Sequence, residues 1–385
     1  MSTLPPASSR EPRRILVRGV NWLGDAVMST PALRRLRERF PAAHIALLTH
    51  AKLAGLWTGH PALDAVIPFA ADAGALAIGR QLRAHNFDLA LVLPNSPRSA
   101  LESWIARIPR RVGYRRSWRN WFLTDCVADR PGAVTMHKRT PGEVRRLVAR
   151  GTGQIVNSPA APGDPAAHHV HQYLHLTAAL GANPAPLPPA LGVSDAEVAA
   201  VANKFELSAG TRWLALNPGA EYGPAKRWPA ERFSAAAQEI QKRSGNVGWI
   251  ILGGAADVQL AATIASAIGR PPAALRNLAG RTSLRELCAV LKLSRVLLTN
   301  DTGPMHVGAA VGTPVVALFG STSPELTGPG LPGEARHTLL RGAAPCAPCY
   351  LRTCPIDFRC LQGIAVETVV AAVLRSLAEG RGLAQ

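Results

Sequence analysis

From Ile15 onward, short apolar runs alternate with amphipathic segments, and this alternation restricts the possible folds more than any other feature of the chain. A parallel sheet buries both faces of its strands beneath helices, so its strands are short, continuous apolar runs. Residues 15–17, 44–48 and 89–93 are such runs, and residues 31–40 show helical periodicity. The pattern predicts an α/β protein built of βαβ units.

The rhythm weakens between residues 128 and 189, where Pro, Gly and His are scattered, and it then restarts. The second half contains further apolar runs and helical segments at 213–216, 232–243, 249–252, 283–293, 296–298, 315–319 and 366–377. At 385 residues the chain is longer than one core usually organises. We predict a disordered N-terminal tail, two α/β domains and a cysteine-containing segment with a C-terminal helix, at 1–14, 15–190, 191–345 and 346–385.

The formal charge of +18 favours an anionic partner, such as nucleic acid, anionic lipid or a phosphorylated substrate. An arginine-biased composition is the alternative explanation of this excess. No apolar run approaches the roughly 18 residues that cross a bilayer. Residues 1–14 lack the apolar run of a secretory signal. We therefore expect a cytoplasmic protein whose contact with a membrane is peripheral.

One polar turn follows the apolar run that ends near Leu298 and precedes a helix. Pro304 suits the first helical turn because no N–H donor is needed there. The backbone N–H groups near Thr302 and Gly303 are then available to a phosphate at the positive end of the helix. The alternative is an ordinary helix start in which Asp301 or Thr302 is the N-cap.

A second candidate phosphate loop, residues 217–228, also follows an apolar run and precedes a helix. Its glycines allow a ligand to approach the backbone, and Lys226 supplies a positive charge for a departing diphosphate. The alternative for Lys226 and Arg227 is a solvated basic pair.

A third turn, residues 19–25, places Asp25 at the start of a helix, at the sheet edge where such folds bind ligands. The alternative is a first-turn acid that stabilises the helix dipole. The turn matches neither the dinucleotide fingerprint nor the ATPase phosphate loop. The chain also has no Asp-x-Asp pair that would hold a metal against a sugar nucleotide, so we expect a metal-free mechanism.

Together, residues 22–33, 218–229 and 300–306 resemble the lipopolysaccharide heptosyltransferases of glycosyltransferase family nine, in order and over nearly the whole chain. Residues 223–229 and the Cys-Ala-Pro-Cys segment are most similar to the members that add the second heptose. The resemblance implies a GT-B architecture, two Rossmann-like domains that face each other across a cleft. It implies an acceptor in the first domain and ADP-heptose in the second.

The implied reaction is inverting transfer of heptose from ADP-L-glycero-D-manno-heptose to heptose I of the lipopolysaccharide inner core, with no cofactor required. The acceptor would be a phosphorylated lipid A-Kdo-heptose at the cytoplasmic face of the inner membrane. Asp25 would be the general base, and Lys226 would steady the diphosphate. The resemblance assigns donor contacts to Glu221, Tyr222, Lys226, Thr282, Asp301, Thr302, Gly303 and His306. Acceptor contacts are expected at Arg18, Asn21 and Trp22.

At one point the chain departs from the family pattern. Family members often present an acid for the ribose after the glycines at 253–254, whereas here Ala255 and Ala256 precede Asp257. The ribose-binding residue is therefore unassigned.

Four cysteines, Cys346, Cys349, Cys354 and Cys360, have a spacing that could surround a tetrahedral zinc ion. The resemblance brings no metal requirement, so a packed cluster of thiols is the favoured interpretation and a structural zinc site is the alternative. Neither interpretation gives these residues a role in catalysis.

Two other functions compete with the leading one. A nucleic-acid-binding protein would use the positive charge, but aromatic residues are 5% of the chain and no binding motif is recognised, so we expect no nucleic-acid partner. A related enzyme that adds the first or third heptose, or uses another ADP-sugar, would share the donor motifs.

Overall fold

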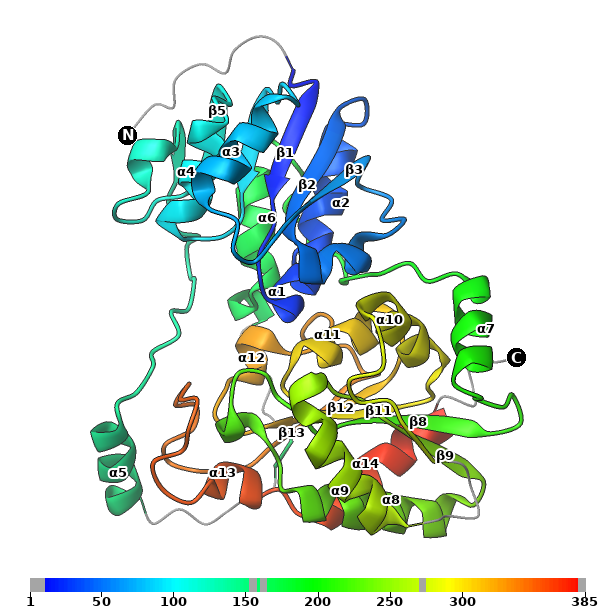
Figure 1. Cartoon of the computed structure of the whole chain (residues 1–385). Coiled ribbons are helices and arrows are strands. Elements are labelled where there is room, and N and C mark those ends of the chain that lie inside the picture. The colour runs from blue at the N-terminus through cyan, green and yellow to red at the C-terminus, as the bar shows by residue number, and fades with distance from the viewer. Residues whose placement is uncertain (1–10, 152–157, 160–164, 270–274, 380–385) are drawn as a thin grey trace. The chain divides into compact units, whose positions relative to one another are not determined.

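The computed structural model describes residues 11–151, 158–159, 165–269 and 275–379. Most of the predicted N-terminal tail lies outside the described residues. The chain divides into two compact units (Figure 1). Unit 1 comprises residues 1–21, 29–131 and 172–186, and unit 2 comprises residues 22–28, 132–171 and 187–385. The chain therefore passes between the units more than once.

Unit 1 is built on a parallel sheet with the strand order β3-β2-β1-β4-β5-β6. Its strands are β1 (Arg14–Arg18), β2 (His44–His50), β3 (Ala65–Phe69), β4 (Leu89–Val92), β5 (Arg110–Tyr114) and β6 (Asp125–Val127). Its helical elements are α2 (Thr30–Arg39), η1 (Ala51–Trp57), α3 (Ala75–Arg83), α4 (Pro97–Ile105), η2 (Asn120–Phe122) and most of α6 (Val170–Ala178).

Unit 2 repeats this order with β10-β9-β8-β11-β12-β13, and β7 adds an antiparallel strand beside β13. Its strands are β7 (Ser158–Pro159), β8 (Arg212–Asn217), β9 (Val247–Ile251), β10 (Leu275–Asn277), β11 (Leu297–Asn300), β12 (Val315–Phe319) and β13 (Thr338–Arg341). Its α-helices are α1 (Leu23–Met28), α5 (Pro141–Arg150), α7 (Asp195–Lys204), α8 (Ala230–Ser244), α9 (Val258–Ile268), α10 (Leu284–Leu293), α11 (Gly303–Ala310), α12 (Pro324–Thr327), α13 (Arg359–Gln362) and α14 (Val366–Glu379). Its short 3₁₀ turns are η3 (Pro165–Ala167), η4 (Pro224–Lys226) and η5 (Ala255–Asp257).

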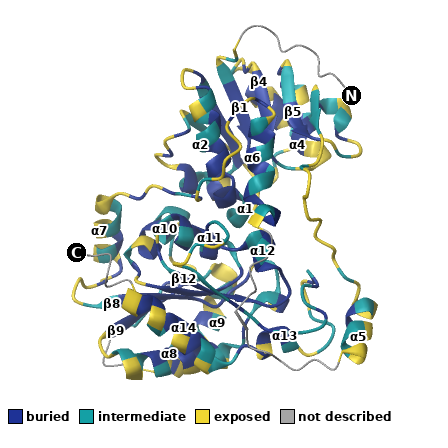
Figure 2. Ribbon diagram, turned by 180° about the vertical axis from the view of Figure 1, so that it is seen from behind, coloured by how far each residue is buried: buried dark blue, intermediate teal, exposed yellow. Residues whose placement is uncertain are grey.

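The cores lie between the sheets and the helices that cover them, and Figure 2 shows the central strands as buried. In unit 2, α14 and α9 pack beside α8 over one face of the sheet. Phe233 of α8, Trp249 of β9 and Val370 of α14 are completely buried in this core. Each such side chain contributes about 1.5–3 kcal/mol through burial, so the two sheets are rigid supports for the loops at their edges.

The predicted α/β class is confirmed, and each apolar run identified in the sequence coincides with a strand. Strands that the sequence pattern did not reveal are β3, β5, β6, β7, β10 and β13. β3 contains Pro68 and lies at a sheet edge, and β5 begins with two arginines, so neither forms a continuous apolar run. Within the described part of the chain, no helix has the length and apolar character needed to cross a membrane.

Candidate active site

In unit 2 the strand order changes direction at β8, which has β9 on one side and β11 on the other. Ligands of doubly wound sheets bind at the carboxyl ends of the strands at such a point. β8 and β11 are paired in parallel, with Asn217 opposite Thr299, so the loops that follow them leave the sheet side by side. These are the two loops that the sequence indicated as phosphate loops.

Asn300, the last residue of β11, joins the two ends of the loop of residues 217–228. Its side-chain amide donates to the Pro218 carbonyl oxygen at 2.7 Å, and its oxygen accepts from the Trp228 backbone N–H at 3.0 Å. The Trp228 indole also donates to the Ile364 carbonyl oxygen at 3.2 Å. Sequence reasoning gave Asn300 no role, although its place in the same motif as Asp301 was a signal.

Lys226 and Asp301 form an ion pair, with 2.7 Å between Nζ and Oδ2. Lys226 retains 15% of its side-chain exposure and Asp301 retains 4%. The Thr322 hydroxyl donates to the same Oδ2 at 2.5 Å. The Lys226 ammonium group therefore has a fixed position with one open side, where it can meet an anion. Thr322 follows β12, and no local sequence pattern indicated it.

The start of α11 favours the phosphate interpretation over the capping one. Thr302 is at the N-cap position, but its side chain makes no capping hydrogen bond. The Asp301 carboxylate is directed to Lys226 and Thr322. Because neither side chain caps the helix, the backbone N–H groups of the first turn, which begins at Gly303, can donate to a ligand. They lie at the positive end of the helix dipole, which favours an anion. The expected N-cap position of Thr302 is confirmed, but its side chain makes no capping hydrogen bond.

Helix α1 packs directly on α11 through two glycines. A side chain at Gly24 would come within 2.7 Å of the His306 ring, and one at Gly303 would come within 2.8 Å of Leu23. Both approaches need glycine, and they bring Asp25 to the start of α11. Asp25 lies in the first turn of α1, so the helix-dipole interpretation fits its position as well.

His306 lies close enough to Asp25, Asp301 and Lys226 for their charges to affect its pKa. Burial lowers the pKa of His306 to about 4, against opposing effects of the Asp301 and Asp25 carboxylates, while Lys226 lowers it further. The imidazole is therefore neutral at pH 7. Burial also lowers the pKa of His169, and Asp25 again opposes the shift. Sequence reasoning missed His169, which lies in the segment 128–189, where the alternation of apolar runs and amphipathic segments weakens.

The other residues expected to contact the donor, Glu221, Tyr222 and Thr282, belong to separate segments of unit 2. The Tyr222 hydroxyl donates to the Tyr350 carbonyl oxygen at 2.7 Å, and the Lys226 ammonium lies 5.1 Å from the Tyr222 ring centre. Glu221, next in the chain, is exposed. Thr282 directly precedes Ser283, the N-cap of α10. Of these residues, Tyr222 is in contact with the Lys226 group.

Sequence reasoning assigned Asp257 no ribose role, and in the structure its carboxylate has partners within the protein. Its carboxylate accepts from the Gly254 backbone N–H at 3.1 Å and pairs with Arg227 at 3.5 Å. A side chain at Gly219 would overlap this carboxylate, so the loop of residues 217–228 lies against Asp257. The ribose-binding residue stays unassigned.

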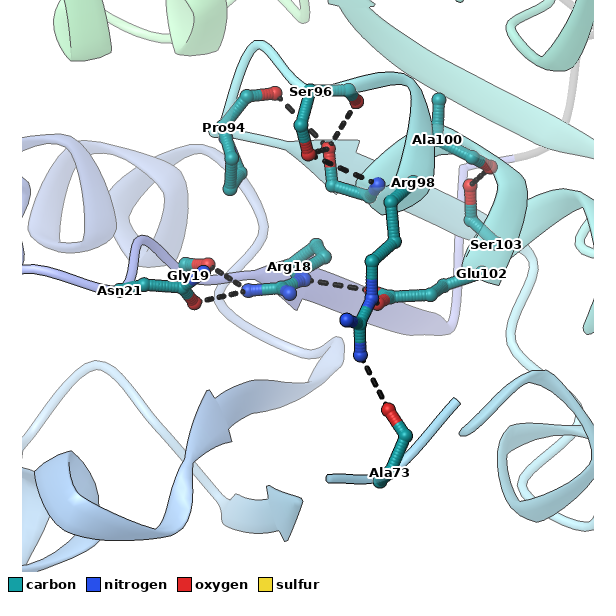
Figure 3. A network of polar contacts seen from close by, with 11 residues as sticks. Arg18, Gly19, Asn21, Ala73, Pro94, Ser96, Arg98, Ala100, Glu102 and Ser103 are labelled. Carbon is teal, nitrogen blue, oxygen red and sulfur yellow. Dashed lines mark hydrogen bonds and ion pairs between the residues drawn. The ribbon is translucent and has the colours of Figure 1, made fainter. Parts of the chain in front are cut away.

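In unit 1, Arg18 ends β1 and enters a buried network (Figure 3). Its Nε donates to the Glu102 carboxylate at 2.8 Å, with exposures of 3% and 0% for the two side chains. Its Nη1 donates to the Asn21 side-chain oxygen at 2.9 Å. Arg18 is therefore placed to hold the turn that contains Asn21. Trp22, half exposed, belongs to unit 2, and the acceptor roles of all three residues stay predictions.

Arg119 is a buried cation of unit 1 that sequence reasoning missed. One guanidinium nitrogen donates to the Asn95 side-chain oxygen at 3.1 Å. The other two nitrogens have no hydrogen-bond partner among the described residues. Burial, with a smaller effect of Arg116, lowers the pKa of Arg119 to about 10. Its place near Gly113, at the end of β5, puts it at the carboxyl edge of the sheet.

The cysteine segment forms a thiol cluster. The four thiols are free and line one small cavity with apolar side chains such as Val144. Burial is the main cause that raises the pKa of Cys360, to about 12. No group of three or more His, Cys, Asp or Glu side chains in the described ranges is arranged to hold a metal ion. The packed-thiol interpretation and the zinc alternative both stay predictions.

The model of glycosyltransferase family 9 (heptosyltransferase) matches residues 75–140 and 149–358. The chain belongs to this family. Family 9 membership makes it a glycosyltransferase, so the enzyme interpretation is confirmed.

Family 9 relatives are similar over most of the chain. Lipopolysaccharide heptosyltransferase 2 of Salmonella typhimurium is 34% identical over 324 residues, 82% of this chain and 85% of the relative. Lipopolysaccharide heptosyltransferase 3 of Escherichia coli is 24% identical, over 79% and 81% of the two chains. The structure of E. coli ADP-heptose lps heptosyltransferase II matches with a TM-score of 0.73 and 28% identity, over 96% and 99% of the chains. The expected GT-B class, with two Rossmann-like units, is confirmed by this family 9 fold.

Proposed function

We propose that this glycosyltransferase transfers heptose from ADP-heptose to heptose I of the lipopolysaccharide inner core, with inversion at the anomeric carbon. The observation that carries the proposal is the gathering of Asp25, Asp301 and Lys226 around His306, at the start of α11. It combines a carboxylate, a fixed ammonium group and a helix N-terminus, which are the parts that a metal-free glycosyl transfer needs.

The choice of acceptor follows from the relatives. Those named heptosyltransferase 2 are 34% identical to this chain in Salmonella typhimurium and in E. coli, whereas heptosyltransferase 3 of E. coli is 24% identical. Residues 223–229 and the Cys-Ala-Pro-Cys segment also resemble the members that add the second heptose. Lipopolysaccharide heptosyltransferase 1 of Pseudomonas aeruginosa is 32% identical over 38% of this chain, whereas the relatives named heptosyltransferase 2 match over 82% of it. Addition of the second heptose is therefore favoured over addition of the first or third.

In the proposed reaction, Asp25 accepts the proton of the acceptor hydroxyl while that oxygen attacks the anomeric carbon of the donor. The bond between the anomeric carbon and the diphosphate oxygen breaks, and ADP leaves with the electron pair. Unit 2 binds the donor and unit 1 supplies acceptor contacts. His306, neutral at pH 7 because burial lowers its pKa to about 4, adds no charge that would neutralise Asp25.

The departing diphosphate is stabilised by Lys226 and by the N–H groups that open α11, in the absence of a side-chain cap. Fixed donors aimed at developing charge are the largest contribution to many transfer reactions. We propose that this pair of features takes the place of a divalent metal, and that no cofactor is required. The acceptor is a phosphorylated lipid, so the enzyme works as a peripheral protein at the cytoplasmic face of the inner membrane.

The decisive experiment compares Asp25→Asn with the wild type, using ADP-heptose and acceptors that carry no heptose, one heptose or two. Wild type should transfer one heptose to the acceptor that has one, as measured by mass spectrometry. Asp25→Asn should lower kcat by about 10²–10⁴-fold, the usual contribution of a general base. Affinity for ADP-heptose should change little. Asp72→Asn, which alters an exposed acid of unit 1, is the control.

Three outcomes would contradict parts of the proposal. Full turnover by Asp25→Asn would exclude Asp25 as the base. Preference of the wild type for the acceptor with no heptose, or for the one with two, would overturn the proposed acceptor but not the proposed transfer chemistry. Loss of turnover after removal of divalent metals, restored by adding them, would overturn the metal-free proposal.

A further inference from the structure

Three tryptophans of unit 1 are exposed to an unusual degree. Trp118 retains 81% of its exposure, Trp121 retains 83% and Trp104 retains 50%. By contrast, Trp228 and Trp249 of unit 2 are buried in the core. A large indole that stays in water forgoes the free energy of burial, so a group of them marks a surface that meets another apolar phase.

The three tryptophans belong to one part of unit 1. Trp121 lies in η2, which packs on α4, the helix that carries Trp104. The Phe122 ring meets Trp104 edge to face, with 5.8 Å between ring centres. Leu123, buried in the core, fixes the segment to the body of the unit.

Trp118 is also held outward by its backbone. Its φ is +64°, in the left-handed region that bulky side chains rarely adopt. Strain of this kind persists where the surrounding structure imposes it, and it is found at functional surfaces.

The stretch of chain that carries these indoles is rich in arginine. Residues 103–130 contain seven arginines and two aspartates, a net formal charge of +5. Arg107 and Arg115 are exposed and form no ion pair with a described residue. The two aspartates pair with Arg110 and Arg116, at 3.5 Å and 2.7 Å. Guanidinium groups bind phosphate oxygens well, while indoles favour the boundary between headgroups and acyl chains.

We infer that Trp104, Trp118, Trp121, Arg107 and Arg115 form a surface, the Trp–Arg surface, that docks unit 1 on an anionic lipid bilayer. The inference rests on the proposed function, because the acceptor of that reaction is embedded in a membrane. Aromatic anchors combined with unpaired arginines match the chemistry of an anionic bilayer in both its apolar and its charged layer. A protein partner would not require the charge excess.

The test is co-sedimentation of the full chain with vesicles of phosphatidylglycerol and phosphatidylcholine, and with vesicles of phosphatidylcholine alone. Wild type should bind the anionic vesicles, less at high salt, and bind the neutral ones weakly. The double variant Trp118→Ser, Trp121→Ser should bind the anionic vesicles at least about ten-fold less tightly. Arg107→Gln and Arg115→Gln should each weaken binding by roughly five-fold, the usual contribution of one basic residue at such a surface.

Leu76→Ser is the matched control, because Leu76 is a half-exposed apolar residue elsewhere on unit 1 and should leave binding unchanged. Thermal unfolding of each variant checks that the fold is intact. Equal binding by the double variant and by Leu76→Ser would overturn the inference, as would equal binding of the wild type to neutral and anionic vesicles, or no binding to either.

A second readout separates this inference from the proposed function. The double variant should transfer heptose to a deacylated, water-soluble acceptor at the wild-type rate, because the Trp–Arg surface acts on the lipid and not on the sugar. Slow transfer to the soluble acceptor by the double variant alone would overturn the inference by giving the tryptophans a role in the reaction. Absence of transfer by the wild type with binding to vesicles intact would overturn the proposed function instead.

Discussion

The two units share one strand order, yet they use charged side chains at the sheet edge in opposite ways. In unit 1, Arg18 at the end of β1 is buried against Glu102, with Arg98 as the outer partner at 3.2 Å. In unit 2, Lys226 and Asp301 form a pair that keeps one side open. The comparison teaches that topology decides where charges gather, while burial decides whether they support the fold or meet a ligand.

The difference in partners has a physical basis. Glu102 has no exposed surface and two arginines, so its charge is fully used within the protein. Lys226 is balanced by a single carboxylate, which the Thr322 hydroxyl also contacts. A diphosphate that approaches Lys226 would compete with one partner and gain the N-terminus of α11 as well. The unit 1 cluster is therefore structural and the unit 2 cluster is poised for binding.

The largest expected effect is on stability, from Glu102→Ala. Removing this carboxylate leaves Arg18 buried without its partner, which costs about 3–5 kcal/mol in the free energy of unfolding. Arg98→Ala removes the outer partner, whose side chain is 49% exposed, and should cost less than about 1 kcal/mol. Urea unfolding of the full chain measures both. Similar losses for the two variants would remove the distinction between a buried and an exposed partner.

The next effect is on the reaction, from Lys226→Met. Loss of a fixed charge at a leaving group lowers kcat by about 10²–10³-fold. Its cost in stability should be smaller than that of Glu102→Ala, because Lys226 is partly exposed and Asp301 keeps the Thr322 hydroxyl. Lys242→Met, at an exposed position of α8, is the control. A variant that loses stability but keeps its kcat would make the unit 2 pair structural, like that of unit 1.

The smallest effect, for a change of one pH unit, is on the dependence of stability on pH. Burial lowers the pKa of His168 to about 3, although its hydrogen bond to the Gly328 carbonyl oxygen opposes the shift. In the unfolded chain this histidine binds a proton near pH 6.5, whereas in folded unit 2 it stays neutral down to about pH 3. Its contribution to the free energy of unfolding is therefore complete above pH 6.5 and is lost as the pH falls toward 3. For one histidine the loss is at most about 1.4 kcal/mol for each pH unit.

Two variants test this dependence. His168→Gln should flatten the decline of the unfolding free energy below pH 6.5, while His137→Gln, at an exposed position, should leave it unchanged. Urea unfolding at a series of pH values provides the measurement. An unchanged slope in His168→Gln would show that another group, such as His60 of unit 1, causes the acid sensitivity; burial is the main cause that lowers the pKa of His60 to about 4.

Much of the candidate site was visible in local sequence patterns. The loops at 217–228 and 301–302 follow apolar runs, and the structure brings them together because β8 and β11 are neighbours. Asn300, Thr322 and His169 were missed because their roles come from contacts across long chain separations, such as the 82 residues between Asn300 and Pro218. Such contacts leave no periodic signal in the chain.

The sequence by itself determined the α/β class, the strands formed by continuous apolar runs, and the order of the motifs that carry charge, because apolar periodicity and turn residues act locally. Only the tertiary structure decided that α1 packs with unit 2, that Asp25 comes near His306, and that Arg18 is paired with Glu102. Those outcomes depend on burial and on charges distant in the chain. A cation–carboxylate pair therefore supports the fold in unit 1, whereas a similar pair in unit 2 is open to an anion.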